Sequence, residues 1–232
     1  GKDKTIEILK DADLREKIKS DINEGLEGWE NWIKNVGFKD IYISMVHSEK
    51  WKDIRGKSIN EITEIKEFSD NWETYFHILI DEELDVSITI NSMSEEDIRR
   101  IMKNEYQMVG TDGAGVPAVK GLGSVHPRMF GTYPRFIRKY VIEEKIIPLE
   151  EMIRKMTSFP AQKLELRDRG LIRENNWADL VIFDERKIKD NATYDNPFQF
   201  PSGIKYVIVN GEIVVNKGKQ RRKYPGKILK RN

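Results

Sequence analysis

The sequence lacks cysteine and contains only three histidines in 232 residues. The absence of cysteine excludes disulfide bridges and thiolate metal sites. The histidines, His47, His77 and His126, have no spacing that would form the first shell of a zinc site, which needs several ligands. The sequence has no run of about 18 apolar residues and no signal-like opening, so we expect no membrane partner and a cytoplasmic protein.

The sequence also has no marked excess of either positive or negative charge. Forty basic and 39 acidic residues give a formal net charge of +1, so the overall field does not favour nucleic acid as a partner. A basic cluster at 217–231 fits a solvated strand edge, because charged side chains protect edges from unwanted pairing. Charged residues make up 34% of the chain. This density is typical of a thermophile, where ion-pair networks lose less to desolvation.

Hydrophobic periodicity predicts an α/β chain in which helices and strands alternate. Helical patterns occur at 13–25, from 58 onward behind a Ser58/Glu61 capping box, and at 72–80, 94–102, 133–144 and 149–159, with a stop before Pro160. Strand patterns occur at 40–46, 85–90, 106–109 and 178–183, and a hairpin at 205–215 turns at Asn210-Gly211 as type I′. The order strand, helix, strand from 85 to 109 predicts a βαβ unit with a parallel pair.

A carboxylate follows the apolar strand predicted at 106–109. The strand runs into Gly110-Thr-Asp-Gly113, so Asp112 stands among small residues that a substrate can approach closely. Active sites of α/β barrels gather at the C-terminal ends of their strands, and Asp112 is therefore the first candidate for chemistry. The alternative is a turn-forming aspartate, a common use of Asp before Gly.

A series of short motifs resembles the D-aminoacylase (N-acyl-D-amino-acid deacylase) family of metal-dependent amidohydrolases. The most specific motifs are His126-Pro-Arg128 and Gly131-Thr-Tyr-Pro-Arg135. Further motifs occur in the family's order at 93–97, 109–113, 154–157, 160–161, 169–170, 178–184 and 209–211. The match runs from about residue 56 onward and is similar to the carboxy-terminal half of the family's sequence.

The resemblance implies the carboxy-terminal part of an amidohydrolase (β/α)8 barrel plus a small β-sandwich subdomain. We expect the barrel part at 1–165, with an insertion or lid-like region around 20–60, and a small β-rich composite domain at 166–232. A complete barrel takes about 250 residues. We therefore expect a partner for this chain, an amino-terminal barrel portion that is a separate chain or is missing from this sequence.

The resemblance also implies the chemistry of the site. The family residue that matches Asp112 is the general base toward a zinc-bound water and can touch a weak second metal site, so Asp112 is the candidate catalytic and metal-binding residue. The family residue that matches Arg128 binds the substrate's α-carboxylate, a task that suits a planar guanidinium. His126 and Gly113 are expected to line the same substrate site. The zinc ligands are expected mainly from the missing amino-terminal portion.

We therefore expect part of a zinc-dependent enzyme that hydrolyses the amide bond of N-acyl-D-amino acids, with a small-molecule substrate. Two alternatives remain open. One is a cyclic-amide hydrolase resembling hydantoinases or dihydroorotases, against which the His-Pro-Arg motif argues, and the other is a non-catalytic structural subunit of a barrel complex. The loop at 114–123 is longer and richer in small residues than is usual in the family, which bears on substrate preference.

Overall fold

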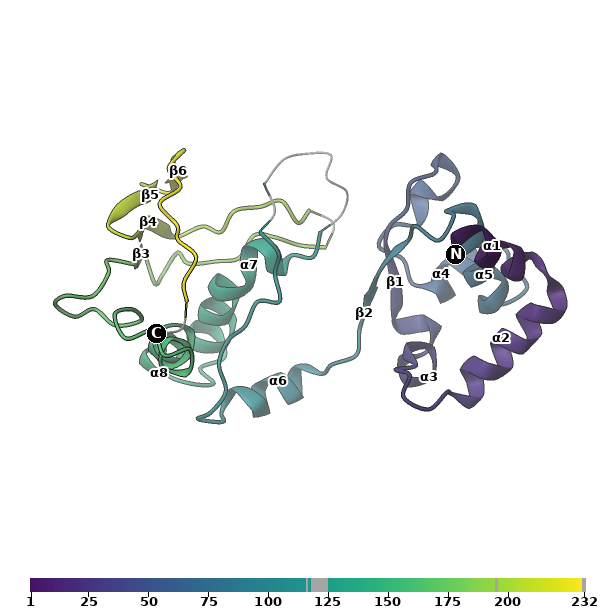
Figure 1. The fold of residues 1–232 in the computed structure, drawn as a ribbon, viewed down its shortest axis with the longest axis horizontal. Helices are drawn as coiled ribbons and strands as arrows, with labels where there is room; N and C mark the ends of the chain where they lie inside the picture. The colour runs from purple at the N-terminus through teal and green to yellow at the C-terminus, as the bar shows by residue number, and fades with distance from the viewer. Residues whose placement is uncertain (116, 118–124, 195, 231–232) are drawn as a thin grey trace. The chain divides into compact units, whose positions relative to one another are not determined.

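A computed structural model of the chain describes residues 1–115, 117, 125–194 and 196–230. The chain divides into two compact units, Gly1–Met93 and Ser94–Asn232, whose ribbons Figure 1 shows. The boundary expected at 165/166 lies inside the second unit, and the composite domain at 166–232 stays a prediction. Within the part that the structure describes, no helix is long and apolar enough to cross a membrane.

The first unit is mostly helical and holds a two-stranded sheet (Figure 1). Strands β1 (Ile41–Met45) and β2 (Ser87–Ile90) pair antiparallel, which confirms the strands expected at 40–46 and 85–90. The capping box of Ser58 and Glu61 is also confirmed. The helices are α1 (Lys2–Lys10), α2 (Ala12–Glu24), α3 (Trp32–Val36), α4 (Ile59–Ile65) and α5 (Asn71–Asp81), with the short 3-10 helices η1 (Phe38–Asp40) and η2 (Glu49–Ile54).

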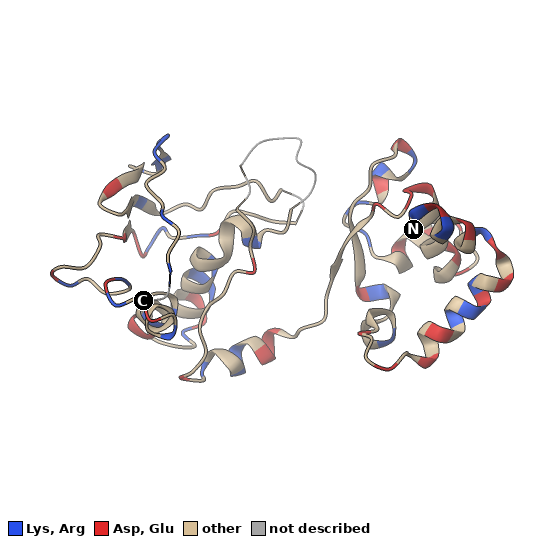
Figure 2. Ribbon diagram, viewed as in Figure 1, with Lys and Arg blue, Asp and Glu red and all other residues tan. Residues whose placement is uncertain are grey.

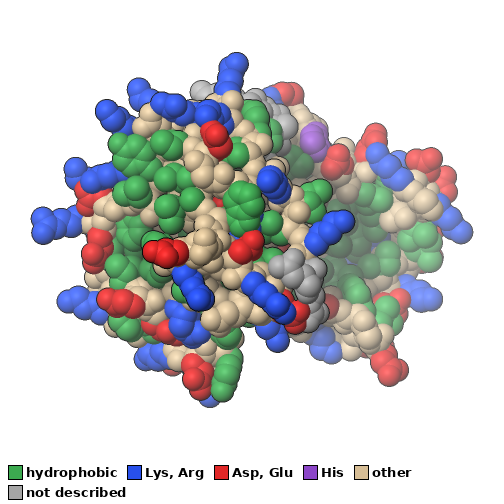
Figure 3. All heavy atoms as spheres, turned by 60° about the vertical axis from the view of Figure 1, so that its left-hand side comes forward, with side chains coloured by type: hydrophobic (Ala, Val, Ile, Leu, Met, Phe, Trp, Pro, Cys, Tyr) green, Lys and Arg blue, Asp and Glu red, His purple; other side chains and the backbone are tan. Residues whose placement is uncertain are grey.

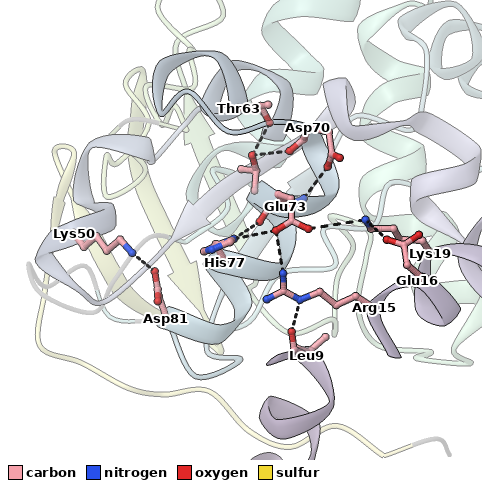
Figure 4. Close-up of polar contacts among 11 residues, drawn as sticks. Leu9, Arg15, Glu16, Lys19, Lys50, Thr63, Asp70, Glu73, His77 and Asp81 are labelled. Atoms are coloured by element: carbon pink, nitrogen blue, oxygen red, sulfur yellow. Dashed lines mark hydrogen bonds and ion pairs between the residues drawn. The ribbon is translucent and has the colours of Figure 1, made fainter. Parts of the chain in front are cut away.

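Hydrogen bonds and ion pairs connect α1 and α2 to α5, as Figure 4 shows. Glu73 of α5 accepts a hydrogen bond from Arg15 at 3.0 Å and lies 3.9 Å from the ammonium of Lys19. Arg15 also donates through Nε to the carbonyl of Leu9, at the end of α1. On α5 itself, Nδ1 of His77 lies 2.8 Å from the Glu73 carbonyl. One guanidinium therefore links three helices, and Glu73 is the acceptor at its centre.

Glu82, just after α5, is a buried carboxylate that holds the chain before η2. Its oxygens accept hydrogen bonds from the backbone N–H groups of His47 and Ser48 and from the Ser48 hydroxyl. Burial raises the pKa of the Glu82 carboxyl, but the bonds from Ser48 and His47 outweigh burial, and the net pKa is lowered. The stabilisation is thus complete above the unfolded-state pKa and is lost as pH falls through the lower folded-state pKa.

The Glu82→Gln variant is expected to unfold more easily at neutral pH. The loss of these charge-assisted hydrogen bonds should lower the free energy of unfolding by about 1.5–3 kcal/mol at pH 7. The loss should shrink at about pH 3, because the carboxyl of the unfolded chain takes up a proton below its ordinary pKa, whereas the native pKa is lowered. Denaturant unfolding at both pH values measures the effect. The control is Glu49→Gln, in an exposed pair with Lys52; equal losses in both variants at pH 7 would contradict the role of Glu82.

The second unit combines helices with a four-stranded antiparallel sheet (Figure 1). The strand order is β3 (Leu180–Phe183), β4 (Ile204–Val209), β5 (Glu212–Asn216) and β6 (Lys219–Gln220). Strand β3 confirms the strand expected at 178–183, and β4 and β5 confirm the hairpin. Asn210 and Gly211 have φ values of 48° and 83°, the positive pair that a type I′ turn requires.

The helices of the second unit depart from the expected bounds at two prolines. Helix α7 begins at Arg128 rather than at 133, and η3 continues it as a π-helix just after Pro134. The helix expected at 149–159 is not stopped by Pro160. Pro160 lies in the first turn of α9, where the N–H that proline lacks needs no partner within the helix. The helices are α6 (Glu95–Met102), α7 (Arg128–Arg135), η3 (Phe136–Glu143), α8 (Leu149–Met156) and α9 (Ser158–Lys163).

The strand expected at 106–109 is not formed, and the prediction of a parallel βαβ unit is wrong. Strand β2 pairs antiparallel with β1 instead, and residues 106–109 lie outside any strand. A strand exists only where a neighbouring segment pairs with its backbone groups. The N–H of Val109 bonds instead to the carbonyl of Lys155, at 3.2 Å.

Residues of both charges occur along the helices of each unit (Figure 2). On the face that Figure 3 presents, charged side chains are interspersed with hydrophobic ones. In the second unit, ion pairs join α6 to η3. Arg99 donates two bonds to Glu144, at 2.7 and 3.0 Å. Glu95 accepts a bond from the Tyr140 hydroxyl at 2.9 Å. Burial and the Glu95 carboxylate raise the pKa of Tyr140 to about 12, so the phenol keeps its proton and donates.

Candidate active site

The segment that leads to Asp112 is held by α8. Lys155, with a side chain 1% exposed, donates to the carbonyls of Asn104 and Gln107, the latter at 3.2 Å. Its own carbonyl accepts from the N–H of Val109. The ammonium lies 3.7 Å from a carboxylate oxygen of Glu151. A buried lysine needs such partners, and these bonds fix the backbone before Asp112 without a neighbouring strand.

Asp112 carries its carboxylate toward Arg128. The backbone of Asp112 is left-handed, with φ 45°, a conformation that aspartate tolerates better than most residues. The local turn is closed by Thr111, whose hydroxyl accepts from the N–H of Gly113 at 3.1 Å. The Asp112 carboxylate instead lies 2.9 Å from Nη2 of Arg128, and its side chain is 88% exposed. Its contact with Arg128 is therefore separate from the turn bond made by Thr111.

Arg128 is the first residue of α7, so the helix fixes the position of the backbone from which its side chain extends. The side chain is 38% exposed, and one nitrogen contacts Asp112. Nε is buried and has no hydrogen-bond partner among the described residues. The guanidinium therefore contacts one carboxylate through a single nitrogen. This contact does not use the full capacity of a planar guanidinium, which can bind a carboxylate through two parallel bonds.

His126 lies between Arg128 and Tyr194. Its Nδ1 accepts a hydrogen bond from the backbone N–H of Arg128 at 3.0 Å, and its Nε2 lies 3.1 Å from the Tyr194 hydroxyl. Burial lowers the pKa of the His126 imidazole, and the charge of Arg128 lowers it further against the opposing charge of Asp112. A neutral ring leaves Nδ1 free to accept.

The structure therefore brings together three of the four candidate residues directly. Asp112, Arg128 and His126 form a connected cluster, and Gly113 is an exposed neighbour of Asp112 in the chain. A Cβ on Gly113 would lie 3.2 Å from Oγ1 of Thr111 and 3.5 Å from Sδ of Met129. The small-residue loop expected at 114–123 lies mostly outside the described residues.

Two residues that support this cluster, Lys155 beneath the Asp112 segment and Tyr194 beside His126, were not predicted. Lys155 lies within the motif at 154–157, but no spacing shows that its ammonium is buried beneath the Asp112 segment. Tyr194 lies far from His126 in sequence, and no local pattern joins them. Such contacts follow from tertiary packing, and a single sequence carries no signal for them.

The residues that the structure describes do not by themselves fit a zinc site. Among the described residues, no three His, Asp or Glu side chains lie close enough to hold a metal ion. In the cluster, both ring nitrogens of His126 are already engaged. Asp112 has an exposed carboxylate and is the one group here that could add a ligand to a metal held elsewhere, whereas zinc takes several ligands.

Comparison with known proteins agrees with the motifs. The Amidohydrolase family matches residues 20–215. The N-acyl-D-glutamate deacylase of Alcaligenes xylosoxydans xylosoxydans is 38% identical over 141 residues, which cover 61% of this chain and 28% of that protein. The N-acyl-D-aspartate deacylase of the same organism is 36% identical over 137 residues, covering 59% of this chain and 26% of that protein.

Solved structures give the same result. A crystal structure of D-aminoacylase matches 83% of this chain and 38% of that one, with a TM-score of 0.68 and 29% identity. The N-acyl-D-glutamate deacylase of Bordetella bronchiseptica, complexed with zinc and a phosphonate inhibitor, matches 79% of this chain and 36% of that one, with a TM-score of 0.63 and 27% identity. The chain thus spans less than two-fifths of each relative's length.

These matches confirm two expectations from the sequence, the resemblance to N-acyl-D-amino-acid deacylases and the partial α/β fold of an amidohydrolase barrel. Because the family match extends over residues 20–215, most of the sequence is accounted for. The chain belongs to the amidohydrolase family.

Proposed function

We propose that this chain is part of an N-acyl-D-amino-acid deacylase and supplies its proton-transfer group and its substrate-carboxylate site. The observation that carries the proposal is the pairing of Asp112 with Arg128, at 2.9 Å. A base and a carboxylate-binding cation side by side suit a substrate with an amide next to a carboxylate. Relatives named as deacylases of N-acyl-D-glutamate and N-acyl-D-aspartate support this substrate class.

Asp112 is proposed as the general base and then the general acid. Its carboxylate accepts a proton from the attacking water and passes that proton to the nitrogen of the leaving amine, so one group serves both halves of the hydrolysis. The exposed side chain is open to the reactants, and the left-handed backbone at Asp112 turns it out of the chain. The products are a carboxylic acid and a free D-amino acid.

Arg128 is proposed to bind the substrate's α-carboxylate, with His126 and Gly113 at the edge of the same site. Two parallel N–H···O bonds to a carboxylate fix its orientation as well as its position. The ion pair with Asp112 engages one guanidinium nitrogen, so an incoming carboxylate competes with Asp112 for Arg128. Substrate binding at Arg128 would therefore release the Asp112 carboxylate for proton transfer.

A metal ion is part of the proposal, with ligands mainly from polypeptide outside this sequence. Zinc is bound in the Bordetella bronchiseptica relative, and a binuclear metal centre is described for D-aminoacylase. Within this chain the group offered to such a centre is the Asp112 carboxylate. We propose that an amino-terminal barrel portion holds the metal and joins the part at 1–165, while 166–232 forms the composite β-rich domain.

The experiment that tests the function measures amine release from several amides. The chain is combined with the amino-terminal portion of the 38%-identical deacylase, and N-acetyl-D-glutamate, N-acetyl-D-aspartate and neutral N-acetyl-D-amino acids are supplied with zinc. We expect amine release from at least one D-substrate and none from its methyl ester. Hydrolysis of hydantoin alone would favour a cyclic-amide hydrolase, and release from no substrate would favour a structural subunit.

An Arg128→Lys variant of that assembly is expected to bind substrate more weakly. Lysine keeps the charge but cannot form the two parallel bonds, so KM should rise by about 10-fold, as for the loss of one bond to a charged group, while kcat changes less. Steady-state kinetics separate the two constants. The control is Arg186→Lys, an exposed arginine after β3; unchanged KM in both variants would remove the role of Arg128.

A further inference from the structure

We propose that Tyr194 is a positioning residue that orients Arg128 through His126. The inference rests on the carboxylate-binding role proposed for Arg128. The Tyr194 hydroxyl lies 3.1 Å from Nε2 of His126, and the two rings meet edge to face with centroids 5.1 Å apart. On its other side, Nδ1 of His126 lies 3.0 Å from the backbone nitrogen of Arg128. A continuous chain of contacts thus runs from Tyr194 to the start of α7.

The contact with Arg128 decides which nitrogen of His126 carries the proton. A backbone N–H can only donate, so Nδ1 must be the unprotonated nitrogen. A neutral imidazole then has its proton on Nε2, which donates to the Tyr194 oxygen. The Tyr194 oxygen accepts this hydrogen bond and so holds the imidazole ring with Nδ1 turned toward Arg128, whose N–H sets the tautomer.

Packing holds the segment that leads to Tyr194, which is itself 56% exposed. The segment 190–194 lies against α7 at Gly131, where an added Cβ would come 3.1 Å from Cβ of Asp190 and 3.8 Å from Cβ of Ala192. Ala192 is 9% exposed. Arg135, one turn further along α7, forms an ion pair with Asp190 at 3.4 Å. The same helix therefore carries Arg128 and fixes the segment that ends at Tyr194.

The contact with His126 fixes the backbone of Arg128 at the start of α7. The first N–H groups of a helix have no partner within the helix, and a side-chain acceptor fixes the residue that carries them. His126 is that acceptor for Arg128. If the Tyr194 hydroxyl is removed, the ring of His126 is free to turn, and the guanidinium loses part of its orientation.

The first test uses nitrogen NMR of the imidazole on the chain itself. Two-bond proton–nitrogen spectra at about pH 8 show which ring nitrogen of a neutral histidine carries the proton, and a His126→Asn variant assigns the signals. We expect the Nε2-protonated form in the native chain and changed His126 nitrogen shifts in Tyr194→Phe, because Nε2–H loses its acceptor and the ring is free to turn. The control is Tyr224→Phe, whose tyrosine is 84% exposed. Unchanged His126 signals in Tyr194→Phe overturn the proposal.

The second test is kinetic and uses the assembly that hydrolyses the D-substrate. Tyr194→Phe should raise KM by about two- to tenfold, the range for one hydrogen bond, with kcat within twofold. In the His126→Asn background, where the asparagine oxygen can accept from Arg128, Tyr194→Phe should add no further loss. An equal rise in KM in that background contradicts the proposal. If the native assembly hydrolyses nothing, the proposed function fails and the NMR test alone decides on Tyr194.

Discussion

An Asp112→Asn variant is expected to hydrolyse its N-acyl-D-amino acid substrate about 10²–10⁴-fold more slowly, the usual contribution of a positioned proton-transfer group. Asparagine has nearly the same shape but cannot take the proton of the attacking water. The KM should not rise, because the amide no longer competes as a charge for Arg128. The loss should therefore appear in kcat, and steady-state kinetics of the reconstituted assembly measure it.

Folding cannot account for such a loss. The ion pair of Asp112 and Arg128 is exposed on the aspartate side, and exposed pairs contribute about 0–1 kcal/mol to stability. Thermal unfolding of Asp112→Asn should therefore stay close to that of the native chain. A Glu185→Gln variant, which removes an exposed charge after β3, serves as the matched control for kinetics. If Asp112→Asn keeps native kcat, another group transfers the proton.

A Gly203→Ala variant is expected to show the largest loss of stability. Gly203 has φ 83°, and an added Cβ would lie 2.4 Å from the backbone nitrogen and 2.5 Å from Cα of Ile188. Neither atom can move without disturbing Ile188, which is 2% exposed in the core. Left-handed strain of roughly 1–2 kcal/mol and overpacking of roughly 1–3 kcal/mol together predict a loss of about 2–5 kcal/mol.

Gly211 offers a control with the same backbone. It also has φ 83°, but an added Cβ would meet no heavy atom within 4 Å. The Gly211→Ala variant should therefore lose only the strain, about 1–2 kcal/mol. Denaturant unfolding of both variants isolates the cost of the collision with Ile188. Equal losses would show that the turn of the chain at Gly203 relaxes away from Ile188.

The elements that could be predicted from the sequence are those whose cause is local. The Ser58/Glu61 capping box and the Asn210-Gly211 turn each depend on a few neighbouring residues, and both formed as expected. The segment 106–109 has an equally apolar pattern but forms no strand. Strand formation depends on a partner backbone, and the pattern of one segment does not say whether that partner is present.

Several motifs that identified the family turn out to be places of close packing. A Cβ on Gly170 would lie 2.6 Å from Cβ of Ala161 and 3.0 Å from the carbonyl of Thr157, so three separate motifs meet at one point. Arg169 pairs with Asp179 and donates to the side chain of Asn210 at 2.6 Å. These motifs therefore have structural reasons that are independent of catalysis.

The candidate site was predictable in its residues but not in its geometry. Asp112 and Arg128 were identified from motifs, and the structure adds the distance between them and the ring of His126 beside them. Tyr194 was missed because 68 residues separate it from His126. The packing of Asp190 and Ala192 on Gly131 places the segment that leads to Tyr194 beside α7.

The buried ammonium of Lys155 links the stability of α8 to the position of Asp112. It donates hydrogen bonds to two carbonyls of the segment that leads to Asp112, and the backbone carbonyl of Lys155 accepts one from the N–H of Val109. Any loosening of α8, by heat or by substitution, would also loosen the segment that carries Asp112, the proposed proton acceptor. If Asp112 acts as proposed, selection for a rigid α8 and selection for fast turnover would act on the same bonds.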